Sequence, residues 1–63
     1  MKDEEPIIQT CYVDLIKPIF TTLYTGMMDK KLSPAETKNL EKRFTAGIAL
    51  ARQVRDRAIQ LLP

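Results

Sequence analysis

The chain has 63 residues, with 10 Lys and Arg against 8 Asp and Glu, no His and one Cys. These counts exclude an internal disulfide and a histidine general base, and a metal site would have to be built from carboxylates and one thiol. A chain this short buries about 60% of its unfolded surface, and its core supplies about 3–5 kcal/mol. We therefore expect a single domain that gains further burial by associating with another chain.

The first residues are acidic where a secretory signal would be basic, because Asp3, Glu4 and Glu5 follow Lys2. The uncharged run 18–28 is too short to span a bilayer. The default expectation is therefore a cytoplasmic protein with no membrane partner. We interpret residues 1–5 as a flexible N-terminus and residues 6–63 as one helical-hairpin domain, in which Pro6 suits the first turn of a helix.

Apolar residues follow helical spacing from Ile7 to Met28 and form two neighbouring stripes. One stripe contains Ile8, Cys11 or Tyr12, Leu15, Ile19 and Leu23. The other contains Val13, Ile16, Phe20, Tyr24 and Met27. Together they cover an arc of about 200°, whereas a helix that faces one neighbour needs only about 100°. The first helix is therefore predicted to be covered on two sides, by its own chain and by another molecule.

Pro18 interrupts this pattern, because a proline inside a helix removes one hydrogen bond and clashes with the carbonyl four residues back, here that of Asp14. We predict a kinked but continuous helix. The alternative is two short helices, 6–16 and 18–29, but Lys17 is a poor cap for the second of them.

The polar stretch 29–32 predicts a short turn, and a strong helix start follows it. Ser33 is a capping residue, Pro34 suits the first turn, and Glu36 completes a capping box. The second helix carries one apolar stripe: Leu40, Phe44, Gly47 or Ile48, Ala51, Val54, Ala58, and Leu61 or Leu62. The fold class is therefore all-α, an antiparallel helical hairpin, and we expect two copies to form a four-helix bundle.

Few residues point to chemistry, so we expect no enzyme activity and no cofactor or metal. Cys11 is interpreted as a small buried hydrophobe, with a thiol near a dimer axis as the alternative. Gly47 lies on the apolar stripe and is expected to let the neighbouring helix approach closely.

Basic residues of the second helix are spread over its faces. Arg43 and Arg55 flank the apolar stripe and are predicted to pair across a protein interface, together with the second stripe of the first helix. The predicted interface consists of Val13, Ile16, Phe20, Tyr24, Met27, Arg43 and Arg55. A nucleic-acid footprint is the alternative, and it would consist of Lys38, Lys42, Arg52 and Arg55.

Two functions follow as hypotheses. The first is a small non-enzymatic regulator or adaptor that binds through its helices, both to a second copy and to a larger protein. The second is a homodimeric bundle that binds RNA or DNA through its basic helix. In length and hairpin architecture the chain is similar to the small plasmid RNA-binding Rop proteins, a likeness of shape with no matching motif.

Overall fold

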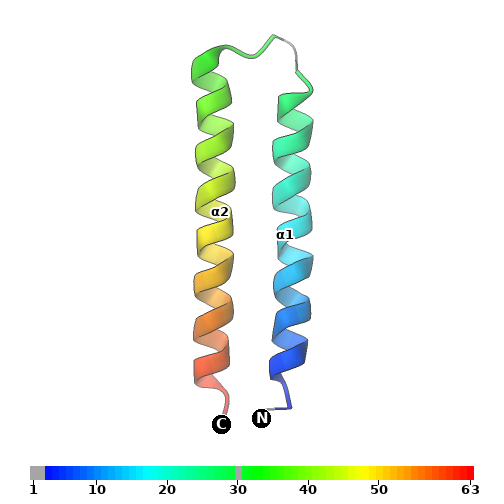
Figure 1. The fold of residues 1–63 in the computed structure, drawn as a ribbon, viewed down its shortest axis with the longest axis vertical. Coiled ribbons are helices and arrows are strands. Elements are labelled where there is room, and N and C mark those ends of the chain that lie inside the picture. Colours follow the sequence, from blue (N-terminus) through cyan, green and yellow to red (C-terminus); the bar gives the residue numbers. More distant parts are fainter. Residues whose placement is uncertain (1–2, 30) are drawn as a thin grey trace.

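The computed structural model describes residues 3–29 and 31–63, so Met1, Lys2 and the predicted turn residue Lys30 lie outside the described residues. Two helices, α1 (Glu5–Met27) and α2 (Pro34–Leu61), are joined by a short connection. They run side by side in opposite directions, with both ends of the chain at the same end of the molecule (Figure 1). The predicted all-α hairpin is confirmed, and the described residues contain no strand. Over those residues, neither helix combines the length and the apolarity that a membrane crossing requires.

Helix α1 is continuous from Glu5 to Met27 with Pro18 inside it, so the alternative of two short helices is wrong. Two threonines beside the proline donate hydrogen bonds back to the helix. The Thr21 hydroxyl donates to the Lys17 carbonyl at 2.9 Å, and the Thr22 hydroxyl donates to the Pro18 carbonyl at 2.9 Å. The helix continues through Pro18, although the Asp14 carbonyl has lost the N–H that residue 18 would donate.

Helix α2 begins with the predicted capping box. The Ser33 hydroxyl accepts from the Glu36 N–H at 3.2 Å, and the Glu36 carboxylate accepts from the Ser33 N–H at 3.3 Å. In the preceding turn, the Asp29 carboxylate accepts from the Lys31 N–H at 2.9 Å. These bonds satisfy backbone donors that the start of a helix leaves free, and they fix where the chain reverses.

The contact between the helices is a single narrow seam, and the molecule measures only 49 × 15 × 10 Å between Cα atoms. Ala51 is buried, with 5% of its surface exposed, and the other seam residues are half-buried. Helix α1 contributes Ile8, Tyr12, Ile16, Ile19 and Leu23. Helix α2 contributes Leu40, Phe44, Ile48, Ala51 and Ala58, and Leu62 follows directly after the helix.

Leu15 and Val54, both predicted on the buried stripes, are exposed. Where two neighbours were alternatives, Tyr12 and Leu62 are half-buried, while Cys11 and Leu61 are exposed. Each exposed residue lies one residue away from a seam residue, on the same side of the hairpin. Tyr12 and Arg55 fill that part of the seam instead, with the Arg55 guanidinium 4.4 Å from the centroid of the Tyr12 ring. The interpretation of Cys11 as a buried hydrophobe is therefore wrong.

Both glycines lie where the helices approach each other. A Cβ at Gly47 would contact the Ile19 side chain at 3.4 Å, an ordinary packing distance. A Cβ at Gly26 would lie 2.6 Å from Cδ1 of Leu40, which is too close. The close approach predicted at Gly47 is therefore tighter at Gly26, where Leu40 packs onto the helix backbone.

Candidate protein interface

The second stripe of α1 is left uncovered by α2. We call it the α1 stripe and define it as Val13, Ile16, Phe20, Tyr24 and Met27. Ile16 is half-buried at the edge of the seam, while the other four are 48–58% exposed. Large apolar side chains in a continuous row at this exposure mark an interaction surface more often than isolated ones do. The expectation that α2 covers only one of the two stripes is met by these exposures.

The α1 stripe is preorganised by its own aromatic residues. The rings of Phe20 and Tyr24 lie one helical turn apart with centroids separated by 6.4 Å and planes inclined by 19°. Such a pair presents a rigid apolar surface that loses little side-chain entropy on binding. The centre of the stripe is therefore its best anchor for a partner.

A second apolar surface lies on the opposite broad side and runs from the middle of the hairpin toward the chain ends. We call it the terminal patch and define it as Leu15, Leu50, Val54 and Leu61, all exposed. Leu15 and Val54 line one shallow groove between the helices, together with the exposed Cys11. The sequence did not predict this patch, because the apolar stripes placed Leu15 and Val54 in the seam. The helical spacing of Leu50, Val54 and Leu61 could have indicated an apolar face on this side of the second helix.

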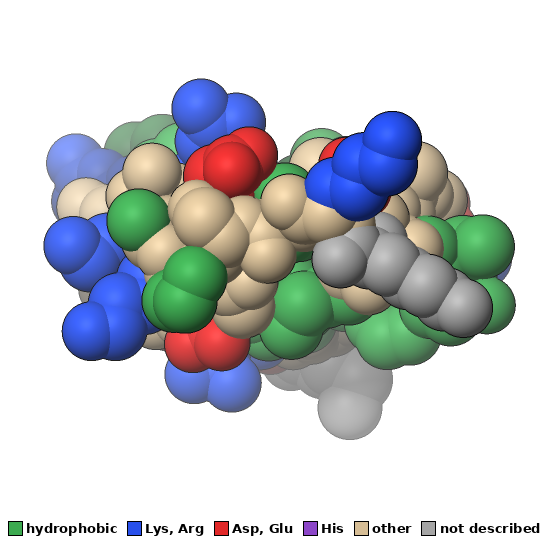
Figure 2. All heavy atoms as spheres, turned by 90° about the horizontal axis from the view of Figure 1, so that it is seen from above, with side chains coloured by type: hydrophobic (Ala, Val, Ile, Leu, Met, Phe, Trp, Pro, Cys, Tyr) green, Lys and Arg blue, Asp and Glu red, His purple; other side chains and the backbone are tan. Residues whose placement is uncertain are grey.

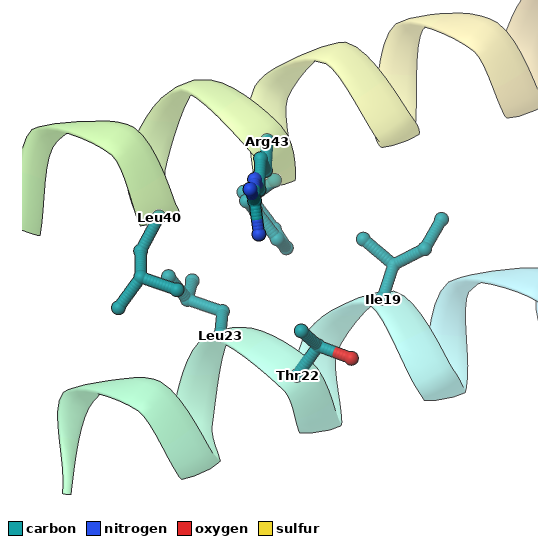
Figure 3. A pocket seen from close by; sticks show the side chains of 6 residues that line it. Ile19, Thr22, Leu23, Leu40 and Arg43 are labelled. Carbon is teal, nitrogen blue, oxygen red and sulfur yellow. The ribbon is translucent and has the colours of Figure 1, made fainter. Parts of the chain in front are cut away.

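The same broad side carries a groove in the half of the hairpin nearer the connection, shown in Figure 3. Ile19, Thr22 and Leu23 line it from α1, and Leu40, Arg43 and Phe44 line it from α2. Its volume is about 150 Å³, below the about 300–1,000 Å³ of most small-molecule sites. Packing between the helices accounts for the groove, with the exposed Arg43 as its polar rim.

The arginines predicted at the interface occupy different places. Arg55 is held within the chain, because it stacks on Tyr12 and donates to the Asp56 carboxylate at 2.9 Å. That hydrogen bond raises the pKa of Arg55, while burial acts in the opposite direction, so the group stays charged. Arg43 lines the groove on the side away from the α1 stripe. Neither arginine therefore lies beside the exposed part of the α1 stripe.

The remaining basic residues of the nucleic-acid alternative are free of the seam. Lys38, Lys42 and Arg52 are exposed on α2, and Figure 2 shows Lys and Arg side chains gathered on the α2 side of the molecule. Lys38 and Lys42 flank a shallow surface hollow that also includes Ala46 and Ala49. Hydrophobic side chains gather instead on the α1 side in the same view. Basic side chains therefore gather on α2, which also carries the exposed Leu50, Val54 and Leu61 of the terminal patch.

Among residues 3–29 and 31–63, no three carboxylate or thiol side chains come close enough together to hold a metal ion. Comparisons with known protein families, with curated proteins and with solved structures found no match. The exposed surfaces of the hairpin are therefore the features that bear on its function.

Proposed function

We propose that this chain is a non-enzymatic binding protein that forms a homodimer through its helices and docks on a larger protein as a regulator or adaptor. One observation carries the proposal, namely the area that the single chain leaves exposed. That area is 5221 Å².

A compact monomer of 7.2 kDa would expose about 4,100 Å². The chain thus exposes about 1,100 Å² more than a compact protein of its mass, and a standard interface removes about 800 Å² from each partner. The radius of gyration is 15.0 Å, where a compact domain of this length has about 11 Å. The excess surface is therefore of the size that one partner covers.

Two finer features belong to the same proposal. Two hairpins packed face to face form a four-helix bundle, and a bend at Pro18 curves α1 around that core. The back-bonded Thr21 and Thr22 favour such a bend. The proposal places the protein in the cytoplasm, where the exposed thiol of Cys11 stays reduced.

Affinity capture of the tagged full chain from its host tests the proposal, with and without nuclease treatment. We expect one larger protein to copurify at comparable molar amount, to resist nuclease, and to be lost when Val54→Asp alters the terminal patch. Capture of nucleic acid, or capture that Val54→Asp and Lys42→Ser reduce equally, would contradict it.

The second candidate is an RNA- or DNA-binding dimer, favoured by the exposed positions of Lys38, Lys42 and Arg52 on α2. Because Arg55 is engaged within the chain, those three residues would make the phosphate contacts. Binding to a fluorescent RNA hairpin that weakens steeply between 50 and 200 mM salt would support this candidate. If the triple variant Lys38→Ser, Lys42→Ser, Arg52→Ser bound the RNA as tightly as the original chain, this candidate function would be contradicted.

A further inference from the structure

We propose that a second copy of the chain covers the α1 stripe in an antiparallel arrangement, with the two-fold axis passing beside Phe20. The inference rests on the proposed function, because it states which of the two apolar surfaces closes the dimer. Three independent features of the chain lead to it: the order of residues in the stripe, the charges on the same side of α2, and the position of the terminal patch.

The α1 stripe reads the same in both directions. Its residues follow one another at steps of three, four, four and three, with Phe20 in the centre. When two identical helices pack antiparallel about a two-fold axis, residues equally far from the axis face each other. Val13 then faces Met27 of the partner subunit, and Ile16 faces Tyr24 of the partner subunit. Each pair sets a smaller branched side chain against a longer one, so the layers fill evenly.

Charged residues of α2 lie on the same broad side as the α1 stripe. At about 100° per residue, Lys38, Glu41, Arg52 and Asp56 point away from the groove side that Arg43 and Val54 occupy. All four are exposed. A second hairpin stacked on this side would bring its own α2 against them, so their signs decide which alignments are allowed.

Contacts within the chain show which residues of α2 lie level with Phe20, and hence with the two-fold axis. Gly47 lies against Ile19, and Arg55 lies over Tyr12, so Phe20 is level with residues 46–47. A two-fold axis at that level sets Glu41 opposite Arg52 of the partner subunit and Lys38 opposite Asp56 of the partner subunit. Both pairs are of opposite charge.

Neighbouring alignments of the two chains bring like charges together. A shift by about three residues in one direction sets Lys38 opposite Arg52 of the partner subunit. A shift by about four residues in the other direction sets Glu41 opposite Asp56 of the partner subunit. Like charges placed directly opposite each other disfavour a complex. The alignment that centres the α1 stripe on Phe20 is therefore also the one that pairs opposite charges on α2.

The terminal patch is less suited to a second copy. It runs from Leu15 and Leu50, near the middle of the helices, to Leu61 at the end of α2, and Arg57 interrupts it on α2. Toward the connection, the same broad side carries Thr25, Glu36, Asn39 and Arg43. A symmetric pair centred on the patch would overlap over the half of each hairpin nearer the chain ends, and it would leave the α1 stripe in water.

Disulfide cross-linking of the full chain tests the arrangement, in a Cys11→Ala background with single cysteines. Phe20→Cys should cross-link with itself. Val13→Cys alone and Met27→Cys alone should not, because in each case 14 residues of helix, about 21 Å, separate the two thiols. An equimolar mixture of Val13→Cys and Met27→Cys should cross-link at least tenfold faster than either alone. This mixture keeps Phe20 in place, so it remains informative if Phe20→Cys weakens the dimer.

Val54→Cys is the matched control, because Val54 and Val13 are equally exposed at 52% and lie on opposite sides. If the chain sediments as a dimer but cross-links through Val54→Cys, or through Val13→Cys alone, the proposed arrangement is wrong. The proposed homodimer would not be contradicted by that result. A chain that sediments as a monomer at 100 µM would overturn both.

A charge exchange tests the α2 pairs separately. Glu41→Arg and Arg52→Glu should each raise the dimer dissociation constant about tenfold, because each change creates two like-charged pairs in the symmetric dimer. The double variant should return it to within about threefold of the original value. A double variant as weak as the single variants would overturn the alignment of α2.

Discussion

At the scale of single residues, the two glycines differ in what a methyl group would meet. At Gly47 a methyl group would contact Ile19 at an ordinary distance, and alanine favours a helix interior by about 1 kcal/mol over glycine. We expect Gly47→Ala to raise the free energy of unfolding by about 0.5–1 kcal/mol, measured by urea denaturation at fixed chain concentration.

Gly26→Ala is the matched control for that prediction. Its methyl group would overlap Leu40, and overpacking of this kind costs about 1–3 kcal/mol, which exceeds the gain in helix propensity of at most about 1 kcal/mol at this helix end. This variant should therefore be less stable than the original chain. Equal stabilisation by both substitutions would mean that Leu40 does not pack onto Gly26 as described.

Residue spacing predicts the seam only to within one position. Tyr12 and Cys11, or Arg55 and Val54, are neighbours that a helical wheel places about 100° apart. Tyr12 and Arg55 lie in the seam, where the guanidinium stacks on the ring and donates a hydrogen bond to the Asp56 carboxylate. A charged residue in the seam is not what hydrophobic periodicity selects, and the exposed Val54 and Leu15 follow from that arrangement.

At the scale of the helices, the capping box of α2 is predicted from the sequence and confirmed. Ser33→Ala should lower the free energy of unfolding by about 1 kcal/mol, because the Glu36 N–H loses its acceptor at the start of the helix. Urea denaturation followed by circular dichroism measures the loss. Ser33→Asp keeps an acceptor and should unfold close to the original midpoint, and an equal loss in both variants would exclude the cap as the cause.

Helix α1 carries a proline that its fold does not require. Pro18 is exposed and lies inside a continuous helix, so Pro18→Ala should stabilise the chain by about 1–3 kcal/mol by restoring a hydrogen bond to the Asp14 carbonyl. Pro6→Ala is the control, because Pro6 lies in the first turn, where a backbone N–H has no carbonyl partner within the helix. This substitution should change the stability little.

The thermal midpoint of both proline variants, measured at one chain concentration, checks this prediction. If Pro18→Ala is destabilising, the bend that we propose at Pro18 contributes to the contacts of the folded state. In that case the helix-propensity argument fails for α1.

At the scale of the whole molecule, the hairpin follows from two periodic segments and a connection too short for any other neighbour relation. The partner does not follow in the same way. An apolar arc wider than one neighbour can cover predicts a partner, and α2 leaves Val13, Phe20 and Tyr24 of that arc exposed. Which molecule covers that arc depends on the order of apolar and charged residues along both helices. Their relative positions follow only from the alignment of α1 with α2 in the structure.

Sedimentation equilibrium of the full chain between 1 and 100 µM is the most direct test of the claim that a second molecule covers the α1 stripe. We predict a mass that rises toward twice the 7.2 kDa of one chain. Phe20→Ser should raise the dissociation constant at least tenfold, while Leu50→Ser, a similarly exposed change on the opposite side, should leave it unchanged. A folded chain that keeps the mass of a monomer over this whole range, or a dimer indifferent to Phe20→Ser, would contradict the claim.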